Sequence, residues 1–115
     1  MVQNRNKLID LLVGNLSNAV VHKILEEAIE DEAVRKHYNR ELLSSLEIAK
    51  RYREKINPVN EPFQEKDISD IKRKIISKVN NELKLRISKG YENINLNAVE
   101  KTTNEVLKNN NIIED

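Results

Sequence analysis

Apolar residues recur along most of the chain at the three- and four-residue spacing of a helix that buries one side. The densest run covers residues 8–29, where a central stripe is widened on both sides: Ile9, Leu12, Leu16, Val20 and Ile24, flanked by Leu8, Leu11, Val13 and Val21. A helix that is apolar around most of its circumference is buried among neighbouring elements or in a subunit interface. We therefore expect the rest of the chain to be organised around this stretch.

Gly14 leaves two interpretations of this stretch open. In one, Gly14 follows a first helix at about residues 4–13, and Asn15 or Ser17 caps a second helix. In the other, Gly14 lies inside one long helix, where it costs about 1 kcal/mol relative to Ala but lets another backbone come close. We favour the first interpretation and predict a break or kink at Gly14.

Capping and breaking residues divide the rest of the chain. Asp31 follows a cluster of acidic residues and is the predicted N-cap of a helix over residues 32–56, with an uninterrupted helix as the alternative. Asn57 and Pro58 end that helix, because the residue before a proline avoids the helical conformation. Both prolines fall in a predicted loop over residues 57–66, from which Val59 and Phe63 are expected to pack onto the core.

The second half of the chain predicts two more helices. Residues 65–89 carry a regular isoleucine and valine stripe, and Gly90 follows as the glycine that typically ends a helix. Asn95 or Asn97 is the predicted start of a last helix over about residues 97–109. The tail, residues 109–115, is expected to be loose or to dock through Ile112 and Ile113.

Composition agrees with an all-α fold. The chain of 115 residues has only two glycines and two prolines, which is far below usual and argues against turn-rich β architecture. We predict one domain over residues 1–115: a four- to five-helix antiparallel bundle with two long helices. Helices of about 25 residues run roughly 37 Å, so one short chain leaves part of their apolar stripes uncovered.

That uncovered surface leads us to expect a homodimer that associates through the apolar N-terminal stretch. Val13 and Val21 lie off its main stripe, and Gly14 and Ala19 leave room for close helix approach. These four residues are the predicted interface. An uncovered apolar surface would also suit binding to another protein, which is the alternative partner.

Charge and cysteine content exclude several classes of function. The chain has no cysteine, so it has no disulfide framework and no thiolate metal site. Its net charge is +1, which gives no general attraction to nucleic acid or anionic membranes. Asp10, Asn15, Asn18 and His22 would each cost free energy in hydrocarbon, and no signal peptide precedes them. We therefore expect a cytoplasmic protein with no membrane partner.

Two helical pairs of histidine and glutamate are weak candidates for a metal site. His22 with Glu26 and His37 with Glu41 are each four residues apart, and a turn near Asp31 sets them at similar heights on antiparallel helices. Imidazole nitrogens and carboxylate oxygens are ligands for zinc. The spacing is unremarkable in a chain with 34% charged residues. We interpret the pairs as ordinary helix-surface contacts and predict neither metal nor cofactor.

A basic strip offers an alternative function. Five cations of the 65–89 helix are candidates for phosphate contacts within a basic face over residues 72–89: Lys72, Arg73, Lys74, Lys78 and Lys84. Acidic residues are interspersed among them, and no aromatic residue is placed to stack on bases. No serine stands in a glycine-flanked elbow, so we predict no catalytic residue and no enzyme activity. The sequence favours a small non-catalytic interaction module, with nucleic-acid association as the alternative.

Overall fold

The computed structural model describes residues 5–56, 63–110 and 112–113, and that part of the chain is all-helical. The helices are α1 (Arg5–Ala28), α2 (Glu32–Ile56), α3 (Glu65–Ser88) and α4 (Val99–Asn109), and a short 3-10 turn at Leu96–Ala98 leads into α4. No strand occurs among these described residues. The all-α prediction is confirmed at this level, with three long helices in place of two.

α1 is the central element of the fold. It runs without interruption through Gly14, so the predicted break there is wrong. Its eleven buried residues lie on several sides of the helix, because α2, α3 and α4 all pack against it. Burial of so many side chains outweighs the cost of about 1 kcal/mol for one internal glycine.

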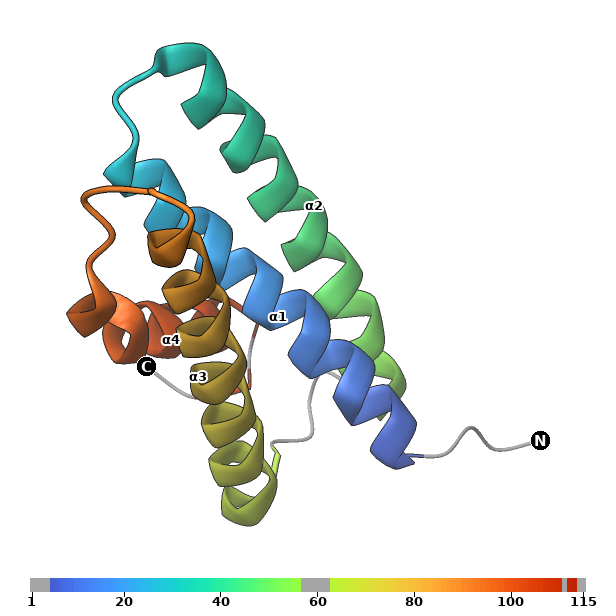
Figure 1. The fold of residues 1–115 in the computed structure, drawn as a ribbon. Coiled ribbons are helices and arrows are strands. Elements are labelled where there is room, and N and C mark those ends of the chain that lie inside the picture. The colour runs from blue at the N-terminus through green and yellow to red at the C-terminus, as the bar shows by residue number, and fades with distance from the viewer. Residues whose placement is uncertain (1–4, 57–62, 111, 114–115) are drawn as a thin grey trace.

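α1 and α2 form an antiparallel pair, and α3 and α4 lie across α1 at clear angles (Figure 1). The Oδ1 atom of Asp31 accepts a hydrogen bond from the Val34 backbone N–H at 3.1 Å, which confirms Asp31 as the N-cap of α2. α2 packs mainly on α1 and buries only Leu42, Ser45, Ala49 and Arg53. Most of its surface is therefore left open.

The predicted end of α3 is confirmed at Gly90. Gly90 has a φ of 101°, and the backbone N–H groups of Gly90 and Tyr91 donate to the carbonyls of Ile87 and Arg86 at 3.0 and 3.1 Å. This is the paired hydrogen-bonding pattern in which glycine closes a helix. The Asn95 side chain then accepts from the Asn97 N–H at 3.0 Å, so Asn95 starts the turn before α4.

Short contacts at the chain's loops and tail complete the core. Phe63 is buried beneath the Arg53 guanidinium, whose carbon lies 4.8 Å from the ring centre, as expected for packing onto the core. Ile112 is also buried, and its N–H donates to the Leu107 carbonyl at 3.0 Å, so the described part of the tail docks. Val59 and the rest of the loop at 57–62 lie outside the described residues.

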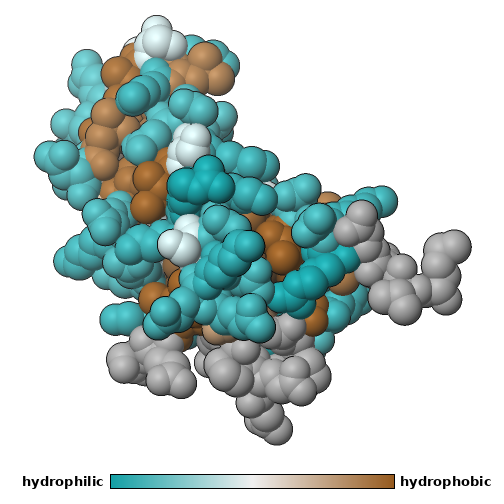
Figure 2. Space-filling view, turned by 90° about the horizontal axis from the view of Figure 1, so that it is seen from below, coloured by the Kyte–Doolittle hydropathy of each residue, from teal (hydrophilic) through white to brown (hydrophobic). Residues whose placement is uncertain are grey.

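α1 has the length and composition of a helix that can cross a membrane, a test that the core helix of a soluble protein also passes. The fold buries 56% of its most apolar window. Seen from below, the surface is mainly hydrophilic with separate apolar patches (Figure 2). Among large apolar side chains, Leu43 on α2 is 58% exposed and Leu85 on α3 is 48% exposed.

Candidate functional site

A polar cleft of about 430 Å³ lies between α1 and α3, which cross each other. Its walls come from the polar side of α1 and from three charged residues of α3. The lining residues are Asp10, Leu11, Gly14, Asn15, Ser17, Asn18, Val21 and His22 from α1, and Lys78, Glu82 and Arg86 from α3. The volume falls in the range of small-molecule sites, about 300–1,000 Å³.

Helical spacing explains why these side chains share one cleft. Gly14, Asn18 and His22 follow one another at four-residue intervals along α1, and so do the three α3 residues. Residues four apart lie on the same side of a helix. Gly14 keeps this part of the cleft open, because a Cβ atom added there would meet nothing within 4 Å.

Unpartnered polar groups are concentrated at this cleft. Among the described residues, three buried side-chain polar atoms have no hydrogen-bond partner, and two of them line the cleft: Ser17 Oγ and His22 Nδ1. Ser17 is only 6% exposed. A buried polar group without a partner costs about 1–3 kcal/mol, so each is an unusual feature of a native fold.

The charges on the α3 wall are unevenly paired. Arg86 Nε donates to Glu82 Oε1 at 3.0 Å, and the guanidinium lies 5.5 Å from the centre of the Tyr91 ring. Lys78 makes no ion pair with any residue in the described part of the chain. Acids and cations are equal in number in the lining, and Lys78 is the cation there that has no ion-pair partner in the described part of the chain.

An aromatic contact fixes His22 at one end of the cleft. Its ring stacks on Tyr38 of α2 with 5.7 Å between ring centres and 28° between planes. Burial lowers the pKa of His22 below its ordinary value of 6.5, and the Glu41 carboxylate opposes this shift. Burial also raises the pKa of Tyr38, with a further contribution from its hydrogen bond with Tyr91. Folding thus favours the neutral forms of both rings.

The weak metal candidates do not form a single cluster. Glu26 accepts hydrogen bonds from the Asn39 amide at 3.3 and 3.5 Å, and the His37 ring lies 5.9 Å from that of Tyr38. Over the ranges that the structure describes, no three histidine, aspartate or glutamate side chains are placed to hold a metal ion. His22 and Glu26 of α1 instead contact Tyr38 and Asn39 of α2, and His37 contacts its own neighbour Tyr38.

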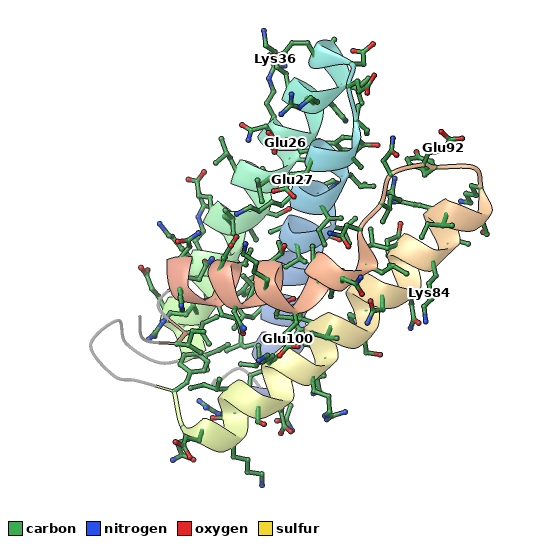
Figure 3. The ribbon with its side chains drawn as sticks, turned by 90° about the vertical axis from the view of Figure 1, so that its left-hand side faces the viewer. Glu26, Glu27, Lys36, Lys84, Glu92 and Glu100 are labelled. Atoms are coloured by element: carbon green, nitrogen blue, oxygen red, sulfur yellow. The ribbon has the colours of Figure 1, made fainter. Side chains whose placement is uncertain are left out.

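The basic strip is spread around α3, and three of its five candidates face acids. Lys72 reaches Glu100 at 3.4 Å, Arg73 reaches Asp70 at 3.7 Å, and Lys74 reaches Asp10 at 3.8 Å. Figure 3 shows Glu100 where α4 meets α3 and Lys84 on the outer side of α3. The five cations therefore do not form one continuous face.

The predicted interface residues lie mostly inside the chain's own core. Val13, Ala19 and Val21 are at most 4% exposed, while Gly14 and Val21 border the cleft. Burial within the chain leaves little of Val13, Ala19 and Val21 for contact with a second chain, and their place in an interface stays a prediction. The periodicity of α1 reveals its main stripe but does not show that three other helices cover its remaining sides.

Comparison with protein-family models, curated proteins and solved structures found no match. A proposal for its function is therefore argued from the geometry of the chain. Sequence reasoning missed the cleft, although it singled out Asn15, Asn18 and His22 as polar positions in an apolar stretch. Their recurrence beside Gly14 and Ser17 was the available signal, but nothing in the sequence places Lys78 opposite them.

Proposed function

We propose that this protein is a non-catalytic interaction module that forms a homodimer through the outer face of α2. The supporting observation is that α2 packs mainly on α1 and leaves the opposite side of a 25-residue helix open. Leu43, near the middle of that side, is the most exposed large apolar residue described. This surface replaces the buried N-terminal residues as the proposed interface.

The outer face of α2 consists of residues that recur at alternating intervals of four and three: Lys36, Arg40, Leu43, Glu47, Lys50 and Glu54. All six are exposed. This interval is the period of a helix–helix seam. A second copy of the same helix is therefore a sterically natural occupant of the face.

Charge along this face favours an antiparallel arrangement of two copies. Lys36 and Arg40 precede Leu43, whereas Glu47 and Glu54 follow it with Lys50 between them. Antiparallel packing sets the cationic half of one face against the half that carries both acids in the partner. Parallel packing would set like halves together, which costs free energy and disfavours that partner arrangement. A two-fold axis near Leu43 satisfies the closed symmetry of most dimers.

The interaction is expected to be weak and concentration-dependent. Burying one leucine side chain contributes about 1.5–3 kcal/mol, and exposed ion pairs contribute about 0–1 kcal/mol each. These gains compete with an association cost of at least several kcal/mol.

Light scattering across a dilution series tests the proposal. The wild-type protein should approach twice its chain mass of 13.4 kDa at high concentration and fall toward 13.4 kDa on dilution. Leu43→Glu should remain a monomer throughout. Leu85→Glu, a matched change at another exposed leucine on α3, should behave as the wild type.

A charge exchange tests the antiparallel arrangement. Arg40→Glu and Glu47→Arg should each weaken the dimer, and the double variant should recover it because opposite charges again face each other. A wild-type protein that stays monomeric contradicts the proposal. A dimer that survives Leu43→Glu places the interface elsewhere.

Nucleic-acid association is the weaker candidate. Three of the five cations proposed for it lie close to acids, which leaves Lys78 and Lys84 on different sides of α3. Binding that weakens steeply with added salt would favour this function over self-association. A cytoplasmic location stays a prediction.

A further inference from the structure

The cleft between α1 and α3 combines three features that point to a ligand. It is large enough for a small molecule, it is bordered by Ser17 and His22 with unpartnered polar atoms, and Gly14 keeps its α1 wall free of a side chain. Buried polar groups in native folds usually have a hydrogen-bond partner from the protein, from water or from a ligand. The α2 outer face lies on another helix, so this inference is independent of the proposed dimer.

The unpaired ammonium of Lys78 indicates the kind of ligand. Glu82 is paired with Arg86 at 3.0 Å, and Asp10 lies 3.8 Å from Lys74. Lys78 is the cleft residue whose charge is matched by no acid within the described part of the chain. An anion bound beside Lys78 would give this ammonium the ion-pair partner that it lacks among the described residues.

We propose that the cleft binds a small molecule through a carboxylate or phosphate group, held by Lys78 and oriented by Ser17. The Lys78 ammonium offers three donors to an oxyanion, and charge-assisted hydrogen bonds are the stronger kind. Ser17 lines the cleft, and its buried hydroxyl has no hydrogen-bond partner among the residues that the structure describes. Asn18 supplies an uncharged amide on the same wall.

Ser17→Ala separates a ligand-binding role from a structural one. The substitution replaces a buried hydroxyl group that has no partner in the described part of the chain with a hydrogen atom. It should leave the protein equally or more stable, because no hydrogen bond is lost. The same change should weaken anion binding. A hydroxyl that served only the fold would give the opposite result, with lower stability and unchanged binding.

Titration of the full chain with inorganic phosphate and, separately, with acetate, followed by backbone amide NMR shifts, tests the proposal. The shifts should saturate and concentrate around Gly14, Ser17 and Asn18. Lys78→Gln should weaken binding about tenfold or more, because it removes a charge-assisted hydrogen bond. Lys84→Gln is the matched control on the outer side of α3 and should bind as the wild type.

The two probes distinguish the source of the oxyanion. Saturation by phosphate alone assigns the cleft to phosphate esters, saturation by acetate alone assigns it to carboxylates, and saturation by both supports the shared chemistry. Shifts that do not saturate with either probe overturn the proposal. Equal weakening by Lys78→Gln and Lys84→Gln also overturns it, because binding would then follow general surface charge.

Discussion

Replacing Gly14 with alanine should stabilise the protein. Gly14 lies inside the continuous helix α1, where glycine is less favourable than alanine by about 0.8–1.0 kcal/mol. The added Cβ would meet no heavy atom within 4 Å, so it brings neither a clash nor a packing gain. The expected gain in the free energy of unfolding is therefore about 1 kcal/mol, which corresponds to roughly 4 °C in Tm for a domain of this size.

Gly90→Ala is the matched control, and its effect should have the opposite sign. Gly90 has a φ of 101°, in the left-handed region that side chains disfavour. Although a Cβ there also meets nothing within 4 Å, the backbone conformation should cost alanine about 1–2 kcal/mol. Because space for a Cβ atom is open at both positions, the difference between the two variants reports the effect of backbone conformation.

Urea unfolding and thermal unfolding, both followed by far-UV circular dichroism, measure the two changes. A loss of stability in Gly14→Ala would refute the reasoning, because it would require a break in α1 or a close neighbour at Gly14. Light scattering on the same variant then distinguishes these causes. A lower dimer mass would place Gly14 in a subunit contact, as the sequence alone suggested.

Three further predictions concern the core, a helix start and pH. Leu16→Ala should lower the free energy of unfolding in urea by about 2–5 kcal/mol, since Leu16 is fully buried; a loss below 1 kcal/mol would contradict its central place. Asp31→Ala should cost about 0.5–2 kcal/mol in the same assay by removing the cap on Val34, and an unchanged midpoint would argue against that cap. Because folding lowers the pKa of His22, the unfolded chain binds more protons there, so stability should fall as pH drops through 6.5 toward the folded-state pKa. His22→Gln should reduce this dependence, and an identical pH profile in the variant would count against it.

Helix boundaries were predictable where local chemistry determines them. Asp31 caps α2 through its own backbone neighbours, and Gly90 closes α3 through hydrogen bonds within six residues. Such short-range patterns can be recognised in a sequence. The error at Gly14 has the opposite origin, because the tertiary burial of α1 overrides the local preference of a single residue.

The candidate site was not predictable because it depends on how two distant helices cross. Lys78 lies 56 or more positions along the chain from every α1 residue that lines the cleft, and the periodicity of α3 does not connect it to any of them. Sequence analysis grouped Lys78 with Lys84 as one basic strip, whereas the fold puts Lys78 at the cleft and Lys84 on the outer side of α3. The burial of Val13 and Val21 was not predictable for the same reason, since a stripe on one helix does not reveal how many neighbours cover it.

The central position of α1 has a consequence for synthesis on the ribosome. About 70 residues separate the end of α1 at Ala28 from the start of α4 at Val99, which corresponds to roughly 4–14 s at 5–20 residues per second. α2 follows α1 immediately and can cover one side of it early, but the sides that α3 and α4 cover stay open until those helices emerge. During this interval the nascent chain presents a long apolar helix of the kind that chaperones and membrane-insertion machinery bind.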